Sequence, residues 1–136
     1  MNFNEQRQSI LEKLEAEWDK NTYPLEMPNT KIEQQPTGPW CRASVLNADT
    51  NPASVTTKMT RTDGILVLQC FERDGMGTAA TAKMGDALAA IFNHLTLTVA
   101  SGIIVFRTVN TQTIGVQDGW HQVNAVVRFR ADAFTA

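Results

Sequence analysis

The chain has 136 residues, of which 43% are hydrophobic and 19% charged, and its formal net charge is −2. This length predicts a single domain, residues 1–136, that can bury its own core, and the composition excludes a disordered tail or a fibre. Duplex-binding domains usually carry an excess of basic residues, so twelve basic against fourteen acidic residues argue against sequence-specific nucleic-acid binding.

The first predicted element is an amphipathic helix over residues 4–20. Its apolar positions recur at helical spacing between charged neighbours, and they are Ile10, Leu11, Leu14 and Trp18. This spacing places them on one face of a helix. Either Asn2 or Asn4 can cap the first turn, and Asn21 followed by Pro24 closes the helix.

Two strands are predicted next. Period-two alternation from residue 40 puts Cys41, Ala43 and Val45 on one face, and Trp40, Arg42 and Ser44 on the other. Residues 47–57 hold one charge and many turn-forming residues, which predicts an exposed loop. A long strand follows over residues 59–72, and its segment 65–68 is apolar on both faces, as in a central strand covered by helices. The Asp-Gly pair at 63–64 fits either a bulge or a tight turn.

The second half of the chain predicts a helix over residues 78–94 and then further strands. The helix has one apolar stripe, Met84, Leu88, Ile91, Phe92 and Leu95, opposite Lys83, Asp86 and Asn93. Residues 102–106 form a strand, and residues 117–120 are a strong signal for a two-residue hairpin turn.

The last strand alternates cleanly. Its inward positions are His121, Val123, Ala125, Val127 and Phe129, and its outward positions are Gln122, Asn124, Arg128 and Arg130. The order of elements is helix, two strands, helix and then two or three antiparallel strands. The predicted fold is therefore α+β, a mainly antiparallel sheet flanked by an N-terminal helix and a central helix.

Cysteine content and hydropathy indicate where the protein resides. Cys41 and Cys70 are too few for a disulfide framework, and each lies in a strand-like apolar stretch, so we expect reduced, buried thiols. No stretch approaches the roughly 20 apolar residues of a membrane span. The N-terminus lacks the basic start and apolar run of a signal peptide, which predicts a protein made in a cytoplasm and without a membrane partner.

A Gly-rich motif, G-x-G-x-x-A, lies at residues 75–80 between a strand and a helix. A dinucleotide site needs such glycines so that the backbone can approach a pyrophosphate, and it also needs an acidic residue about twenty positions further on. No Asp or Glu occurs between Asp86 and Asp118. Gly75 and Gly77 are therefore interpreted as easing a tight turn, with a small cofactor-binding enzyme kept as an alternative of a different class.

Other catalytic and metal-binding patterns are weak. Cys41, Cys70, His94 and His121 match no zinc-ligand spacing, and His121 belongs to the inward series of the last strand. None of the four serines lies in G-x-S-x-G, and a cysteine within an apolar strand is usually inert. The acidic residues of the first helix lie mostly on its solvated face. We therefore predict no enzyme activity, no catalytic residue, no metal and no cofactor.

Arginine and tryptophan gather in two strands and suggest a contact surface. The candidate interface residues are Trp40, Arg42, Trp120, Arg128 and Arg130. These residue types are favoured in protein–protein contacts. The alternative is a solvated outer face with two partly buried tryptophans, and the sequence favours neither interpretation.

Four segments together resemble the tail terminator-like (tail completion) proteins of long-tailed bacteriophages. Residues 23–29 resemble that family's aromatic-Pro-x-x-x-Pro-Asn element, and residues 40–45 its Trp-x-Arg-x-x-Val strand. Residues 61–71 with the turn at 75–78 are similar to its long strand and glycine turn. Residues 119–129 are similar to its closing Gly-Trp-aromatic-Gln-Val-Asn strand, with His121 in place of the expected tyrosine.

The resemblance covers most of the chain in the right order and implies a structural virion protein. A hexameric ring of subunits is expected to cap the tail tube, to stop its polymerisation and to present a surface to the head–tail connector protein. The implied partners are other copies of the chain, the tail tube protein and the connector, and assembly takes place in the bacterial host cytoplasm. The alternative within assembly proteins is another head–tail joining or minor tail protein of similar fold.

Overall fold

Helix α1 spans Phe3–Glu17 in the computed structural model, which describes residues 1–30, 36–52 and 58–134. Asn2 caps it, because its side-chain oxygen accepts a hydrogen bond from the Glu5 amide at 2.8 Å. The helix ends three residues before the predicted residue 20. Trp18 is already extended and buried, and the Asp19 carboxylate accepts hydrogen bonds from the next turn instead of allowing the helix to continue.

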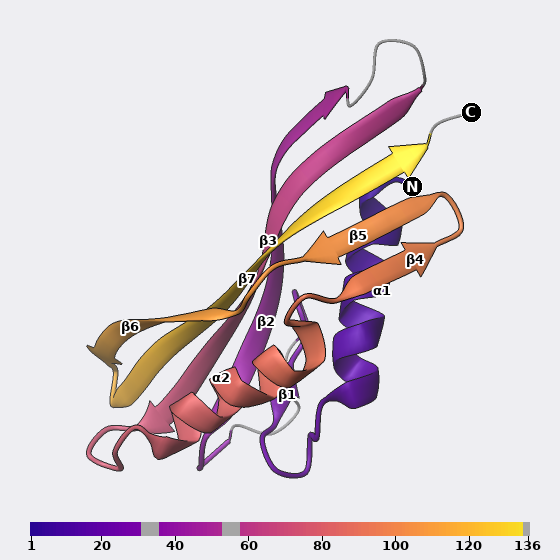
Figure 1. Cartoon of the computed structure of the whole chain (residues 1–136). Helices are drawn as coiled ribbons and strands as arrows, with labels where there is room; N and C mark the ends of the chain where they lie inside the picture. Colours follow the sequence, from indigo (N-terminus) through magenta and orange to yellow (C-terminus); the bar gives the residue numbers. More distant parts are fainter. Residues whose placement is uncertain (31–35, 53–57, 135–136) are drawn as a thin grey trace.

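In these described ranges, seven strands form one curled sheet in the order β1-β2-β3-β7-β5-β4, with β6 pairing β7 (Figure 1). Strands β3 (Met59–Arg73) and β7 (Trp120–Phe134) pair antiparallel over all fifteen residues and form its centre. Strand β2 (Trp40–Pro52) pairs antiparallel with the other side of β3. The short β1 (Leu25–Glu26) adds parallel to β2 and was not predicted from the sequence.

The other elements complete the predicted α+β fold. Helix α2 spans Ala79–Phe92. A hairpin of β4 (Thr96–Val99) and β5 (Gly102–Phe106) follows it, and β4 was not predicted. Strand β6 (Asn110–Gln117) joins β7 through Asp118 and Gly119, both at positive φ, which is the expected two-residue hairpin turn. The prediction of a mainly antiparallel sheet flanked by an N-terminal and a central helix is confirmed.

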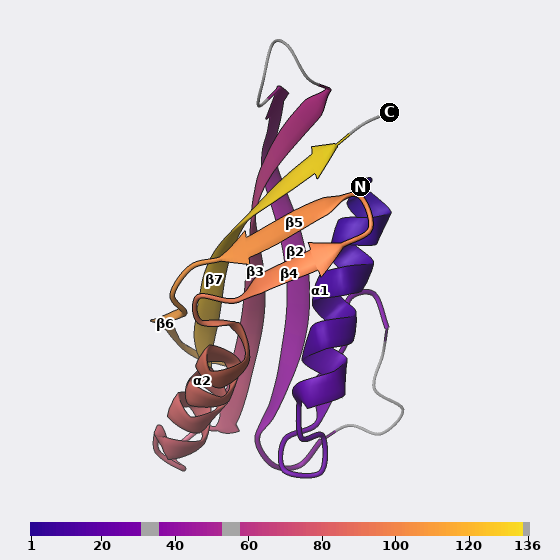
Figure 2. The same ribbon diagram turned by 45° about the vertical axis from the view of Figure 1, so that its right-hand side comes forward.

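Both helices pack on the same face of the sheet. Alternate residues of the central strands, such as Leu66, Leu68 and Val127, are fully buried in one cluster with residues of α1 and α2. The β4–β5 hairpin lies across α1 in both views (Figures 1 and 2), where the Ser101 hydroxyl donates to the Glu5 carboxylate at 3.2 Å. The predicted alternation of β7 is confirmed, since Val123, Ala125, Val127 and Phe129 are buried.

The opposite side of β2, β3 and β7 carries neither helix, and we call it the open face. It consists of the residues that alternate with the core positions, among them Arg42, Ile65, Val67 and Arg128. Ile65 and Val67 are half-buried, whereas Leu66 and Leu68 are fully buried. The expectation that residues 65–68 are covered by helices on both faces is therefore wrong, although β3 is a central strand as predicted.

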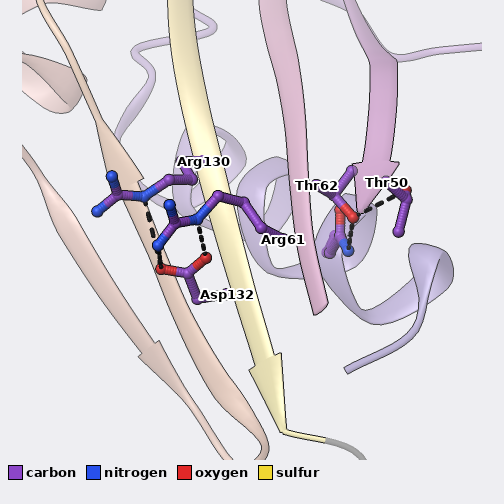
Figure 3. Close-up of polar contacts among 6 residues, drawn as sticks. Thr50, Arg61, Thr62, Arg130 and Asp132 are labelled. Carbon is purple, nitrogen blue, oxygen red and sulfur yellow. Dashed lines mark hydrogen bonds and ion pairs between the residues drawn. The ribbon is translucent and has the colours of Figure 1, made fainter. Parts of the chain in front are cut away.

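The predicted loop at 47–57 is wrong for its first half, and residues 53–57 lie outside the described ranges. Residues 47–52 continue β2 through an irregularity between Asn47 and Thr50, because β3 continues beside them as a pairing template. A polar cluster secures this region (Figure 3): the Gln6 amide donates to the Thr62 hydroxyl at 3.5 Å, and the Thr50 and Thr62 hydroxyls lie 3.0 Å apart. The pair at 63–64 is not a turn, since both residues pair continuously with β7. The register irregularity lies on its other side, where β2 carries one extra residue between Asn47 and Thr50 opposite Asp63.

The apolar stripe of α2 is confirmed at its centre. Met84, Leu88 and Phe92 are fully buried, and the Phe92 ring lies 4.9 Å from the Phe106 ring between centroids. Ile91 and Leu95 are half-buried at the edge of the core. Neither α1 nor α2 is long and apolar enough to cross a membrane, which holds for every helix of the described ranges.

Candidate interaction surface

An aromatic cluster occupies one end of the open face. Trp40 of β2 stacks on Phe71 of β3 with ring centroids 4.5 Å apart, and its edge meets Trp120 of β7 at 6.2 Å. The Arg42 guanidinium lies over the first two rings, at 5.9 and 5.4 Å, and the Arg73 guanidinium lies 4.1 Å from the Trp120 ring. Cation–π attraction favours arginines placed over aromatic rings in this way.

This cluster is packed within the chain itself. Trp40 and Phe71 are each only 8% exposed, and Arg42 donates from Nε to the Gln69 side-chain oxygen at 2.7 Å. The two tryptophans lie at the same end of the sheet, on strands that flank β3. Phe71 and Arg73 were missed because their membership of the face follows from the β2–β3–β7 register, which no local pattern reveals.

An arginine–aspartate group lies further along the open face (Figure 3). Asp132, 6% exposed, accepts from Arg61 Nε at 2.8 Å and from Arg61 Nη2 at 3.3 Å, and Arg130 Nε lies 3.5 Å from it. The hydrogen bond with Asp132 raises the pKa of Arg61 above its usual value. Arg130, one of the nominated residues, is therefore already committed to an ion pair within the chain.

A hollow of about 490 Å³ opens beside this group. Its polar walls are formed by Asp49, Asp63, Arg107, Arg128 and Arg130, and its apolar walls include Leu46 and Ile65. Arg107 directly follows β5, and its backbone amide donates to the Arg128 carbonyl at 2.9 Å, so the two residues are cross-strand neighbours. Arg107 was not nominated from the sequence, because it lies in a connection where no periodicity assigns it to a face.

The five nominated residues lie on one face but in two groups. Trp40, Arg42 and Trp120 are in the aromatic cluster, whereas Arg128 and Arg130 border the hollow. Trp120 and Arg128 are eight positions apart in β7, a separation of roughly 27 Å along a strand. A single small ligand cannot contact both groups, but a protein surface can.

The glycine turn has a backbone explanation. Gly75 and Gly77 both have φ of +84°, in the left-handed region that favours glycine, and they lead β3 into α2. Strand β3 is antiparallel to both of its neighbours. The parallel strand–helix–strand unit that positions a pyrophosphate is therefore absent at this turn.

The candidate zinc ligands are only partly brought together. Cys41 and Cys70 are register partners on β2 and β3, both fully buried as free thiols. Burial raises the pKa of both thiols, to about 12 for Cys70. His94 follows α2, and His121 pairs with Glu72 at the start of β7. Within residues 1–30, 36–52 and 58–134, no three His, Cys, Asp or Glu side chains are grouped as a metal site would need.

Comparison with known proteins links this fold to one family. A family model described as phage tail terminator protein matches residues 7–129. No curated protein matches the sequence. One solved structure superposes over 100% of this chain and 99% of its own, with a TM-score of 0.75 and 20% sequence identity, which shows a shared fold.

Proposed function

The chain belongs to the phage tail terminator protein family, and from this premise we propose that it caps the tail tube as a hexameric ring. Members of this family are structural components of the phage tail, so the protein is a virion component. The finer proposal is that the ring terminates tube polymerisation and presents the surface to which the head–tail connector binds. Assembly would take place in the bacterial host cytoplasm.

The observation that carries the proposal is the family match over residues 7–129, which runs from within α1 through α2 and the sheet as far as Phe129. The open face supports it, because a structural role requires surfaces rather than an active site. Fifteen-residue strands β3 and β7 hold the nominated side chains on a common scaffold. Such a scaffold can present two separate contact groups to large protein partners.

In a ring, a change at one surface residue affects every subunit contact. Subunits that meet through different surfaces close into a ring when their rotation permits, and every contact is then repeated around it. A weakened contact is repeated as well, so assembly is more sensitive than folding. Of the five nominated residues, Arg128 is the exposed arginine without an ion-pair or hydrogen-bond partner among the described residues, which makes it the best residue to test.

The test is complementation of a phage that lacks this protein, with tail length and head attachment scored by electron microscopy. Arg128→Glu should leave the melting temperature unchanged, since exposed substitutions alter stability by about 0.5 kcal/mol or less. Its tails should be overlong or headless, as in the deletion. Lys83→Glu is the matched control, because it makes the same charge change at an exposed position of α2.

Two results separate the surface from the function. If Arg128→Glu supports normal tails, the arginine is solvated surface and the interface assignment is wrong. If the deletion itself leaves tail length and head joining intact, the terminator function is wrong.

A further inference from the structure

Two arginines that line the same hollow form no ion pair with any described residue. Arg107 and Arg128 are cross-strand neighbours, both exposed, and within the described ranges neither has a carboxylate at ion-pair distance. Like charges directly opposed across a sheet are destabilising. Both arginines border a hollow of about 490 Å³, which is an arrangement that a partner with negative charge would complement.

The other charged groups of the hollow do not neutralise the positive charges of Arg107 and Arg128. Arg130 is shared with Asp132, and Asp63 is the register partner of Arg130 on β3. Asp49 lines the hollow from β2, but it forms no ion pair within 4 Å with an arginine of this part of the structure. The hollow therefore combines an apolar floor, which includes Leu46 at 53% exposure, with unneutralised positive charge on one side.

The rest of the same chain carries the opposite charge. The open face and its hollow hold six arginines, Arg42, Arg61, Arg73, Arg107, Arg128 and Arg130, and three aspartates, Asp49, Asp63 and Asp132. That is a net charge of +3 in a chain of formal charge −2, so the remainder carries −5. The positively charged open face of one copy can therefore attract an acidic surface of another copy.

Helix α1 offers a surface that matches the hollow. A second hollow, of about 380 Å³, lies between residues 27–30 and one side of α1, which we call its outer face. It is lined by the apolar Leu11 and Met27 together with Glu12 and Glu15. Glu15 is ion-paired with Lys20 at 2.9 Å, whereas Glu12 accepts only from the uncharged Gln8 amide at 2.9 Å. Arg7 also borders this hollow and donates to Asn4. Glu12 is the α1 carboxylate at this hollow that lacks a cation partner within the described chain.

We propose that the arginine hollow of one subunit receives the outer face of α1 from a second copy, with Glu12 placed against Arg107 and Arg128. The inference rests on the proposed ring, and it names the two surfaces that meet in it. Because these surfaces differ, the contact is head-to-tail, which is the type that closes rings. Charge pairing sets the register, and the apolar floor of each hollow supplies buried area.

Charge exchange tests this pairing with the full-length protein. Ring formation is measured by sedimentation velocity, alone and with tail tube subunits, for Arg128→Glu, Glu12→Arg and the double variant. Each single reversal should reduce the ring population by roughly tenfold or more, since it places like charges against each other. The double variant restores opposite charges and should recover the rings. Lys83→Glu and Asp86→Arg are matched controls on α2 and should assemble like the unaltered protein.

The alternative outcomes each overturn the inference and are distinguishable from failure of the proposed function. Rings that persist in both single variants, or that the double variant does not recover, show that these surfaces do not meet. If the Arg128→Glu variant forms normal rings that no longer cap tubes, the hollow binds the tube protein. If the variant forms normal rings but loses binding to duplex DNA, measured by fluorescence anisotropy, the hollow binds DNA. In all these cases the deletion phenotype still decides the terminator function separately.

Discussion

At the scale of single residues, Gly64 shows how packing selects a glycine inside a strand. A Cβ atom at this position would lie 2.4 Å from the Phe129 ring carbon Cζ and 2.7 Å from the Leu46 carbonyl oxygen. The Phe129 ring is 3% exposed and stacks toward Phe106, so it cannot move away freely. The glycine thus allows a close approach of β3 to the Phe129 ring and the Leu46 backbone, and it does not form the tight turn that the Asp-Gly pair also suggested.

We predict that Gly64→Ala destabilises the fold by about 1–3 kcal/mol, as overpacking of a filled core does. Urea denaturation followed by circular dichroism measures the change. Gly38→Ala is the control, because nothing lies within 4 Å of a Cβ built there. Equal stability of both variants with the unaltered protein would show that the Phe129 ring yields without cost.

The two buried thiols predict a pH dependence. Desolvation raises the pKa of Cys41 and holds that of Cys70 near 12, and Cys70 adds to the shift of Cys41. Thiols of the unfolded chain titrate near 8.5. Above that pH the unfolded state releases protons that the folded state retains, so the stabilisation present at lower pH is lost progressively as the pH rises toward the folded values.

The test is to measure the free energy of unfolding at pH 8 and at pH 10, for the unaltered protein and for the Cys41→Ala/Cys70→Ala double variant. The unaltered protein should lose more stability over this interval than the variant, by at least about 1 kcal/mol, given about 1.4 kcal/mol per pH unit for each thiol. The comparison cancels other groups that titrate in the same range. Identical losses would mean that the thiols ionise equally in both states.

At the scale of elements, helix α2 is the part of the fold that the sequence predicted best. Its stripe is buried where expected, and we predict that Phe92→Ala costs about 3–5 kcal/mol, because a large side chain is removed from a site with no exposure. Met76→Ala, at 70% exposure, is the control and should change little. A measured loss below about 1 kcal/mol for Phe92→Ala would contradict the assignment of this helix face.

The strands show why other elements could not be predicted. Periodicity identified the cores of β2, β3 and β7, since a buried face leaves alternation in the sequence. Residues 47–52 read as a loop because their small polar residues form a strand only beside the extended β3. The two-residue β1 and four-residue β4 depend on neighbours distant in sequence, on β2 at Cys41 and on β5 at Val105. Pairing partners of this kind leave no local signal.

The sequence predicted which side of the sheet these residues occupy, but it did not predict which residues they contact. Alternation placed Arg42 and Arg128 outward, and the structure confirms both positions. Their different surroundings follow from the register: Arg42 lies over aromatic rings, whereas Arg128 lies beside Arg107 at the hollow. The ion pair between Arg61 and Asp132 likewise could not be predicted, because the two residues are seventy-one positions apart in the chain.

At the scale of the whole molecule, the distribution of surfaces is consistent with a tail component. Helices cover one side of the sheet (Figure 1). The other side carries charged groups, among them Arg61, Arg130 and Asp132 (Figure 3), and apolar groups at the hollow. In the proposed ring, the arginine hollow and the outer face of α1 would contact identical neighbours, and other surfaces would remain for the tube and the connector. The number of subunits and the order of these contacts belong to the proposal.

The central claim, that this protein stops tube growth, is tested most directly by adding it to tail tube subunits during polymerisation. Electron microscopy then gives the tube lengths and shows what occupies each tube end. We predict that elongation stops after the addition and that a ring of this protein caps one end of each tube. Tubes that continue to lengthen at an unchanged rate, with no additional density at either end, would contradict the account.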